Sequence, residues 1–403
     1  MSADIPIVFG LETEFGITRE VEPNEELDVV AESIALVRAN PFPAIRMRWD
    51  YRFEDPHADA RGFRVAELRQ DFDESNYTAA DAARPLSFPE IKSDLVLANG
   101  ARFYNDHAHP EYCTPECSTP DEVLLHDRAG ELIVRRCAEV IRERHGTQVR
   151  LYKNNTDFRG HSYGCHENYL LPRALPWEKL AIGAQAFLVA RQVFAGAGKF
   201  GFEDEDRFLR GGFQLSQRAD FFTELQSVDT MQRRPIVNTR DEPHANAAHW
   251  RRFHVIIGDS NMSPFATRLK VGTTALVLQA LSAAHAKPHL WEMFPRLTAP
   301  IRALKAISHD PSLVVRVELR DGKTASGLDI LGQYLRFVRE ALGENLGEWR
   351  EAILGDWAEV LRDLREDPEL CADRLDWVAK RMLVRQFQAE HSLESDDPWL
   401  RSL

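Results

Sequence analysis

The 403-residue sequence has few cysteines and no long apolar run. Its five cysteines are odd in number and lack disulfide-type spacing, which fits a reducing compartment. The longest apolar stretch, Ala181–Ala190, is too short to span a bilayer, and the first ten residues lack the basic region and apolar core of a signal peptide. These absences predict a soluble cytoplasmic protein.

Positive charge is also scarce, because the sequence has 50 Lys and Arg residues but 63 Asp and Glu residues, which gives a formal net charge of −13. With no basic run to contact phosphates, a nucleic-acid partner is not expected. The sequence contains no GxxxxGK[ST] loop, protein-kinase set or GxSxG elbow. Any bound ATP therefore needs a carboxylate–metal platform on a sheet. At 44% hydrophobic and 28% charged residues, the chain can bury the core of one large domain or two.

The stretch at residues 99–116, NGARFYNDHAHPEYCTPE, is the centre of the interpretation. If a strand runs from Leu95 onward, its period of two places Arg102, Tyr104 and Asp106 on one face. One hypothesis is a polar bed for a metal-bound anionic substrate. The other is a sheet with one solvated face, the commoner cause of alternation.

Two further strands place polar side chains side by side. In the strand predicted at Ile7–Ile17, Glu12 and Glu14 face the same way, as a divalent cation or a solvated acidic edge would require. In a later strand, His166 and Asn168 share a face. His166 is either a metal or phosphate contact or a hydrogen-bonded core histidine.

Periodicity and capping signals predict the remaining elements. Thr119 begins a helix that ends at Gly146. Other helices are expected at Glu25–Asn40 and Trp177–Val193, and from Thr267 onward. In the last of these, the stripe of Trp377, Leu383 and Phe387 is interpreted as core or as a helix-packing seam. Strands are expected at Gln148–Lys153, Phe213–Arg218 and Arg252–Gly258.

Three other segments give functional hypotheses. Residues 41–89 contain five prolines and an acidic run, and they begin with the aromatic and charged Arg48–Phe63, which suggests a lid or substrate-sensing loop. Arg218, Arg240 and Arg252 are candidate cations for a triphosphate and a carboxylate. The His and Cys residues between His107 and Cys117 lack the paired spacing of a structural zinc site, so zinc is not expected.

Eight motifs, in order along the chain, closely resemble the Pup ligase/depupylase family of carboxylate-amine ligases related to glutamine synthetase. They are GLETEFG, NGARFYNDHAHPEY, YKNNTD, SYGCHENYL, LSQR, NTRDEPHA, HVIIGDSNMS and KVGTTALVL. The resemblance implies an α/β (α+β) fold: a curved, mostly antiparallel sheet backed by helices, with a helical C-terminal part. It covers residues 7–403, a single large catalytic domain with a loop insertion at about residues 48–90. The family's small C-terminal domain is expected to be absent or truncated.

One branch of this family ligates Pup to lysines, and the other is the Pup deamidase/depupylase. The insertion and the spacing of Asp106 to Glu111 resemble the depupylase branch, whereas ETEFG, YGCHENY and GDSNMS look more like the ligases. We give the insertion more weight and expect an ATP- and Mg²⁺-dependent hydrolase of Pup conjugates or of Pup's terminal glutamine. The alternatives are a Pup–protein ligase and a catalytically silent Pup-binding regulator.

The resemblance implies roles for individual residues, acting in a monomer that binds Pup or a Pup-like modifier and its conjugates. Asp106 matches the catalytic aspartate, and Arg102 and Thr114 match ATP contacts. The implied Mg²⁺ ligands are Glu12, Tyr104, Glu111 and His166. From their charge, we add Arg218 and Arg240 as contacts for phosphate or the Pup carboxylate.

Overall fold

The computed structural model describes residues 8–20, 27–46, 55–66, 85–157, 160–203, 212–229, 234–394 and 397. Its main feature is a nine-stranded sheet in the order β13-β14-β15-β10-β1-β8-β7-β6-β3. All neighbours pair antiparallel except β13 and β14, which confirms a mostly antiparallel sheet. The strands are β13 (Phe222–Ser227), β14 (Arg234–Asn238), β15 (Trp250–Val255), β10 (Cys165–Pro172), β1 (Val8–Glu14), β8 (His109–Cys113), β7 (Arg102–Asp106), β6 (Leu95–Leu97) and β3 (Ala44–Arg46).

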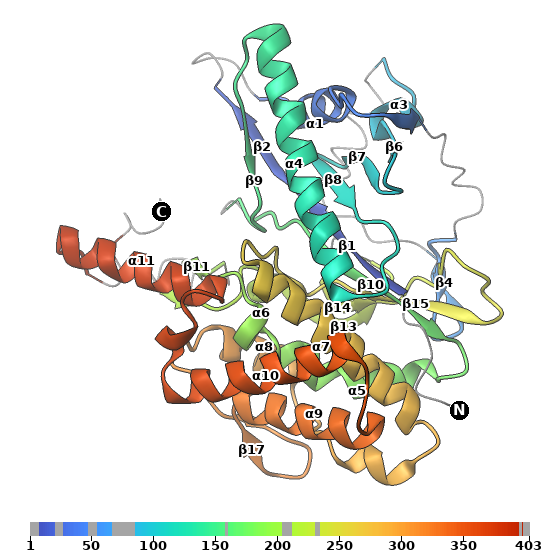
Figure 1. Cartoon of the computed structure of the whole chain (residues 1–403), viewed down its shortest axis with the longest axis vertical. Coiled ribbons are helices and arrows are strands. Elements are labelled where there is room, and N and C mark those ends of the chain that lie inside the picture. Colours follow the sequence, from blue (N-terminus) through green and yellow to red (C-terminus); the bar gives the residue numbers. More distant parts are fainter. Residues whose placement is uncertain are drawn as a thin grey trace.

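Helices cover one face of this sheet and extend below it (Figure 1). The long helix α4 (Pro120–His145) contacts β1 and β8, α1 (Val29–Arg38) contacts β7 and β8, and α7 (Pro264–Ala284) contacts β10. Further helices pack around α7 or follow it: α5 (Trp177–Ala190), α6 (Gln192–Ala195), α8 (Pro300–Ser308), α9 (Gly327–Leu342), α10 (Glu348–Glu366) and α11 (Asp376–His391). The helical C-terminal part is therefore confirmed.

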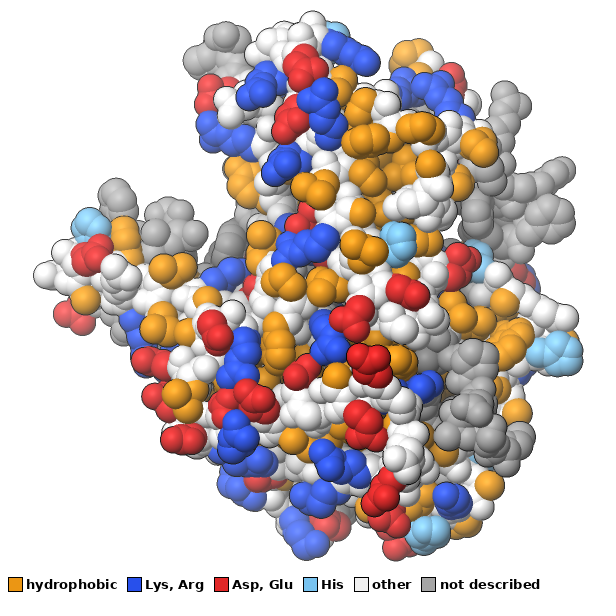
Figure 2. Space-filling model, viewed as in Figure 1, with side chains coloured by type: hydrophobic (Ala, Val, Ile, Leu, Met, Phe, Trp, Pro, Cys, Tyr) orange, Lys and Arg blue, Asp and Glu red, His pale blue; other side chains and the backbone are white. Residues whose placement is uncertain are grey.

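The expected start and end of α4 are confirmed. The Thr119 side chain accepts a hydrogen bond from the Glu122 backbone, the Glu122 carboxylate accepts one from the Thr119 backbone, and Gly146 ends the helix at φ 70°. α1 is shorter than predicted, because Asp28 caps it. On the face shown in Figure 2, acidic and basic side chains are intermixed over the lower helices. Within the described residues, no helix has both the length and the apolar character needed to cross a membrane.

Two strand predictions were wrong in their extent. The strand expected from Leu95 onward is a hairpin of β6 and β7, because Gly100 (φ 84°) turns the chain between them. The strand expected at Ile7–Ile17 is interrupted at Phe15, after which β2 (Gly16–Arg19) leaves the main sheet to pair with β9 (Val149–Tyr152). Neither break changes the predicted faces, since the alternation within β1 and β7 is kept.

Two other predictions failed because tertiary contacts override local pattern. Only Phe213–Gln214 of the strand predicted at Phe213–Arg218 pairs, as β12 with β11 (Lys199–Phe200). On α11, Trp377 is buried as predicted, but Leu383 is 65% exposed, so the stripe is not all core.

Candidate active site

Four neighbouring strands bring the predicted polar residues together. On β1, Glu12 lies opposite His166 of β10, and Glu14 lies opposite Glu111 of β8. On β7, Arg102, Tyr104 and Asp106 are half-buried on one face, while the residues between them are buried on the other. The face predicted from the period of two is therefore confirmed.

A first cluster consists of three carboxylates. Glu14, Asp106 and Glu111 each place one oxygen so that all three atoms lie within 4.8 Å of one another. Burial, followed by the charges of Asp106, Glu12 and Glu14, raises the pKa of Glu111 well above its ordinary value. Tyr104 donates a hydrogen bond to Glu111 Oε1 over 2.8 Å. Like charges held this close favour a hard divalent cation between them.

A second cluster contains Glu12, His166 and His254, whose ligand atoms also lie within 4.8 Å of one another. His166 Nδ1 and His254 Nε2 lie 3.3 and 3.5 Å from Glu12 Oε2. Among the described residues, His166 Nε2 and both ring nitrogens of His254 are buried without a hydrogen-bond partner. Burial and then Arg252 lower the pKa of His254 to about 4, so its ring is neutral, the form that binds a metal.

The donor atoms of both clusters fit divalent cations. The first offers the carboxylate oxygens that Mg²⁺ prefers, and the second adds imidazole nitrogens left without partners. Tyr104 stands beside the first cluster as a donor to Glu111. Burial and the charges of Asp106 and Glu111 raise the pKa of Tyr104 well above its ordinary value, so the phenol stays protonated.

Asp106 is held as an ionised carboxylate. Lys92, at the end of α3 (Phe88–Lys92), pairs with Asp106 Oδ1, and His107 Nδ1 lies 3.0 Å from Oδ2. Burial alone would raise the pKa of Asp106, but His107 and Lys92 lower it well below its ordinary value. An unprotonated carboxylate next to a cation site can act as a nucleophile or a general base.

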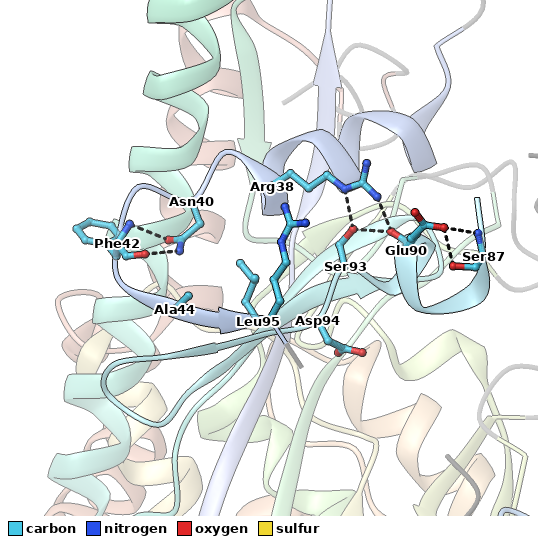
Figure 3. A pocket seen from close by; sticks show the side chains of 10 residues that line it. Arg38, Asn40, Phe42, Ala44, Ser87, Glu90, Ser93, Asp94 and Leu95 are labelled. Atoms are coloured by element: carbon cyan, nitrogen blue, oxygen red, sulfur yellow. Dashed lines mark hydrogen bonds between the residues drawn. The ribbon is translucent and has the colours of Figure 1, made fainter. Parts of the chain in front are cut away.

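The predicted nucleotide contacts lie at the neighbouring edge of the site. Arg102 Nε donates to Asp94 Oδ1 over 2.8 Å, and its guanidinium lies 4.0 Å from the centre of the Tyr104 ring. Thr114 Oγ1 accepts a hydrogen bond from the Leu11 backbone over 3.1 Å, which ties the end of β8 to β1. Asp94 also lines a cavity of about 900 Å³ at the edge of the sheet (Figure 3). The carboxylates of the two clusters are not among the residues that line this cavity.

The two arginines predicted from charge alone differ in placement. Arg218 is fully buried, and it donates to the Ser162 hydroxyl and to two backbone carbonyls, one of which is that of Gly258 at 3.1 Å. Of the guanidinium nitrogens of Arg218, Nη2 has no hydrogen-bond partner among the described residues. An anion could therefore bind to Arg218 through this nitrogen. Arg240 is half-buried, and its Nε donates to the Val228 carbonyl over 3.0 Å. Their anion-binding roles stay predictions.

The start of the predicted insertion docks beside Arg240. Its short hairpin pairs β4 (Ala58–Asp59) with β5 (Phe63–Arg64). Buried Asp59 accepts a hydrogen bond from the Thr239 hydroxyl over 2.7 Å, and Ala60 N donates to the Thr239 carbonyl over 2.8 Å. Residues 48–54 and 67–84 of the predicted insertion lie outside the described residues.

Sequence reasoning missed three site residues. Glu14 was considered with Glu12 as a possible cation site but was left out of the implied Mg²⁺ ligands, and His254 was read only as part of a strand. The spacing of Arg252 and His254 on one face of β15 was the available signal. Lys92 carried no recognisable signal, since only the fold brings α3 to Asp106.

The underside of β1 is tied to α4 by polar contacts. Thr13 Oγ1 donates to Asp127 over 3.2 Å, and buried Lys153 lies 2.7 and 2.6 Å from the carboxylates of Asp127 and Glu131.

We expect Lys153→Met to lower the free energy of unfolding by about 3 kcal/mol, because it leaves Asp127 buried without its cation. Chemical denaturation measures this, with exposed Lys323→Met as the control. Equal stability of the two variants would contradict the expectation.

Comparisons with known proteins show which family this chain belongs to. The family model described as Pup-ligase protein matches residues 7–403. A depupylase of Acidothermus cellulolyticus is 41% identical over 404 residues, covering 97% of this chain and 75% of the relative. A Pup–protein ligase of Xylanimonas cellulosilytica is 43% identical over 326 residues, covering 77% of this chain and 69% of the relative.

Two solved structures have the same fold. The complex between Pup and its ligase PafA matches with a TM-score of 0.73 at 29% identity, covering 98% of this chain and 71% of that one. A Pup ligase PafA in complex with ADP matches with a TM-score of 0.69 at 31% identity, covering 84% of this chain and 74% of that one. From the match along residues 7–403 and the relatives that cover nearly all of it, this chain belongs to the Pup-ligase protein family.

Proposed function

We propose that this chain is a depupylase. It is an ATP- and Mg²⁺-dependent hydrolase of the isopeptide bond between Pup, or a Pup-like modifier, and substrate lysines, of the terminal glutamine amide of Pup, or of both. The observation that carries the proposal is the ionised Asp106 beside the cluster of Glu14 and Glu111. The depupylase relative matches 97% of the chain at 41% identity, which supports hydrolysis.

The chain's own residues supply the reactive carboxylate. Lys92 and His107 keep Asp106 unprotonated, so it can attack the scissile carbonyl carbon or take a proton from an attacking water. Glu14 and Glu111 with Asp106, and Glu12 with the two histidines, would hold the Mg²⁺ ions. Bound there, Mg²⁺ supplies positive charge that stabilises the oxyanion developing on the carbonyl.

We place the nucleotide at Arg102 and Thr114. The ADP in the related ligase structure supports nucleotide binding in this fold. Arg102 is fixed in place by Asp94 and by the Tyr104 ring, and a pre-oriented guanidinium suits phosphate. Nη2 of Arg218, together with Arg240, would bind a phosphate or the carboxylate of the modifier.

The docked start of the insertion gives a test of its role at the site. We expect Asp59→Ala to lower turnover by about tenfold, because it frees the hairpin from Thr239 next to Arg240 and misplacement of a binding group is costly. Steady-state kinetics measure the loss. Arg64→Ala, on the same hairpin but pairing with Asp55 at the surface, is the matched control. Equal turnover of the two variants would remove the insertion's proposed role.

The direct test of the function uses the purified chain, ATP, Mg²⁺ and a Pup-conjugated protein, followed by gel electrophoresis. Release of unmodified protein and free Pup is the expected result. Attachment of free Pup to lysines with ADP release would instead make the chain a ligase. Binding of Pup without either reaction would make it a silent regulator.

We further propose that the chain acts as a monomer in the cytoplasm and takes no nucleic-acid partner. All five cysteines are unpaired, and the net charge is −13. Light scattering of the purified chain tests the oligomeric state, and fractionation of cells tests the location.

A further inference from the structure

The underside of β10 carries a buried charge directly beneath the site. The strand alternates strictly, so His166 and Asn168 face the site while their neighbours are buried on the helical side. One of these neighbours, Glu167, has an exposed fraction of 0%. A carboxylate in that position is costly unless it is fully paired.

Glu167 is fully paired. Arg191, which directly follows α5 and is 2% exposed, approaches it with two nitrogens: Nη1 lies 2.7 Å from Oε2 and Nη2 lies 2.5 Å from Oε1. The Tyr169 hydroxyl donates to Oε2 over 2.7 Å, and Arg191 Nη1 also donates to the Thr274 hydroxyl of α7 over 2.6 Å. The pair thus joins β10 to two helices.

The chain after β15 closes over the same pair. A Cβ atom at Gly258 would lie 2.7 Å from Glu167 Oε1 and 2.9 Å from the Cys165 carbonyl, so only glycine fits without a shift. β15 carries His254. The strands of both site histidines therefore meet at this buried carboxylate.

We infer that the Arg191–Glu167 pair is a positioning device that fixes the register and rotation of β10 so that His166 and Asn168 meet Glu12. A slip of one residue would turn these two side chains into the core and Glu167 out of its pairing. Because an unpaired buried charge is strongly unfavourable, the pair excludes such arrangements. The inference rests on the proposed metal-binding role of Glu12, His166 and His254.

A purely stabilising role makes a different prediction. Replacing a buried ion pair by apolar residues of similar size is often neutral or favourable for stability. If the pair only stabilises the fold, the double variant Glu167→Leu/Arg191→Met keeps both its fold and its metal site. If the pair positions β10, the double variant folds but binds the metal more weakly.

The experiment measures Mn²⁺ binding by electron paramagnetic resonance of the free ion, which does not depend on turnover, and thermal unfolding of the same samples. We expect the double variant to unfold near the wild-type temperature but to bind Mn²⁺ about 10- to 100-fold more weakly. Loss of the groups that support metal ligands typically weakens metal binding by this factor. Arg191→Lys keeps the charge without the two-point contact, so we expect an intermediate loss.

Arg374→Met is the matched control, because Arg374 pairs with Asp363 on α10, in the helical part of the chain. It should lower the unfolding temperature and leave Mn²⁺ affinity unchanged. If the double variant bound Mn²⁺ with wild-type affinity, the positioning role would be overturned and the proposed metal site would stand. A wild-type protein that binds no Mn²⁺ would overturn the proposed metal site and this inference with it.

Discussion

Asp106→Asn should lower the turnover of a Pup conjugate by about 10³-fold, the scale of a lost general base or nucleophile. The amide keeps the size of the carboxylate and one acceptor oxygen but cannot attack a carbonyl or accept a proton at neutral pH. Lys92 and His107 hold the wild-type group in its reactive form, so the loss falls on the chemical step. Single-turnover assays on the loaded protein measure it.

Binding and stability should change much less in this variant. The Asp106 carboxyl is 23% exposed and its pair with Lys92 is partly solvated, so we expect a stability loss below about 1 kcal/mol. Exposed Asp321→Asn, in the turn between β16 (Val317–Glu318) and β17 (Thr324–Ala325), controls for the chemistry of the substitution. Turnover above a tenth of wild type would exclude Asp106 as the catalytic residue.

Glu111→Gln should remove the stabilisation that Mg²⁺ bound at the first cluster gives the protein. At a Mg²⁺ concentration 100 times its Kd, wild type should gain about 2.7 kcal/mol in unfolding free energy. The variant loses a ligand of the first cluster, so its unfolding temperature should respond to Mg²⁺ less than that of wild type, and the remaining response should come from Glu12, His166 and His254. Without metal it should be as stable as wild type or more so, because the substitution removes a charge that Asp106, Glu12 and Glu14 repel.

The pH dependence of the metal-free protein tests the same cluster. The folded-state pKa of Glu111 is raised above its ordinary value of 4.5, so the folded protein binds more protons than the unfolded chain between these two values. Stability should therefore fall as pH rises through that window, and Mg²⁺ should suppress the fall.

Thermal unfolding with Mg²⁺ and with a chelator, at several pH values, measures both effects. Exposed Glu116→Gln, three residues beyond β8, is the control and should behave as wild type. A Glu111→Gln variant that still responds fully to Mg²⁺ would remove Glu111 from the metal site.

The sequence alone determined the local features of this protein. The period of two decided that Arg102, Tyr104 and Asp106 share a face, and a capping box with a terminal glycine decided where α4 begins and ends. Both depend on backbone geometry within a few residues, which composition and spacing specify directly.

Only the tertiary structure decided which strands and helices meet. His254 reaches Glu12 because β15 pairs with β10 and β10 with β1, and Lys92 reaches Asp106 because α3 lies against β7. Likewise, Glu167 is a buried ion-pair partner because α5 ends under β10. Pairing between distant segments depends on the packing of the whole core, and a local hydrophobic pattern does not contain that information.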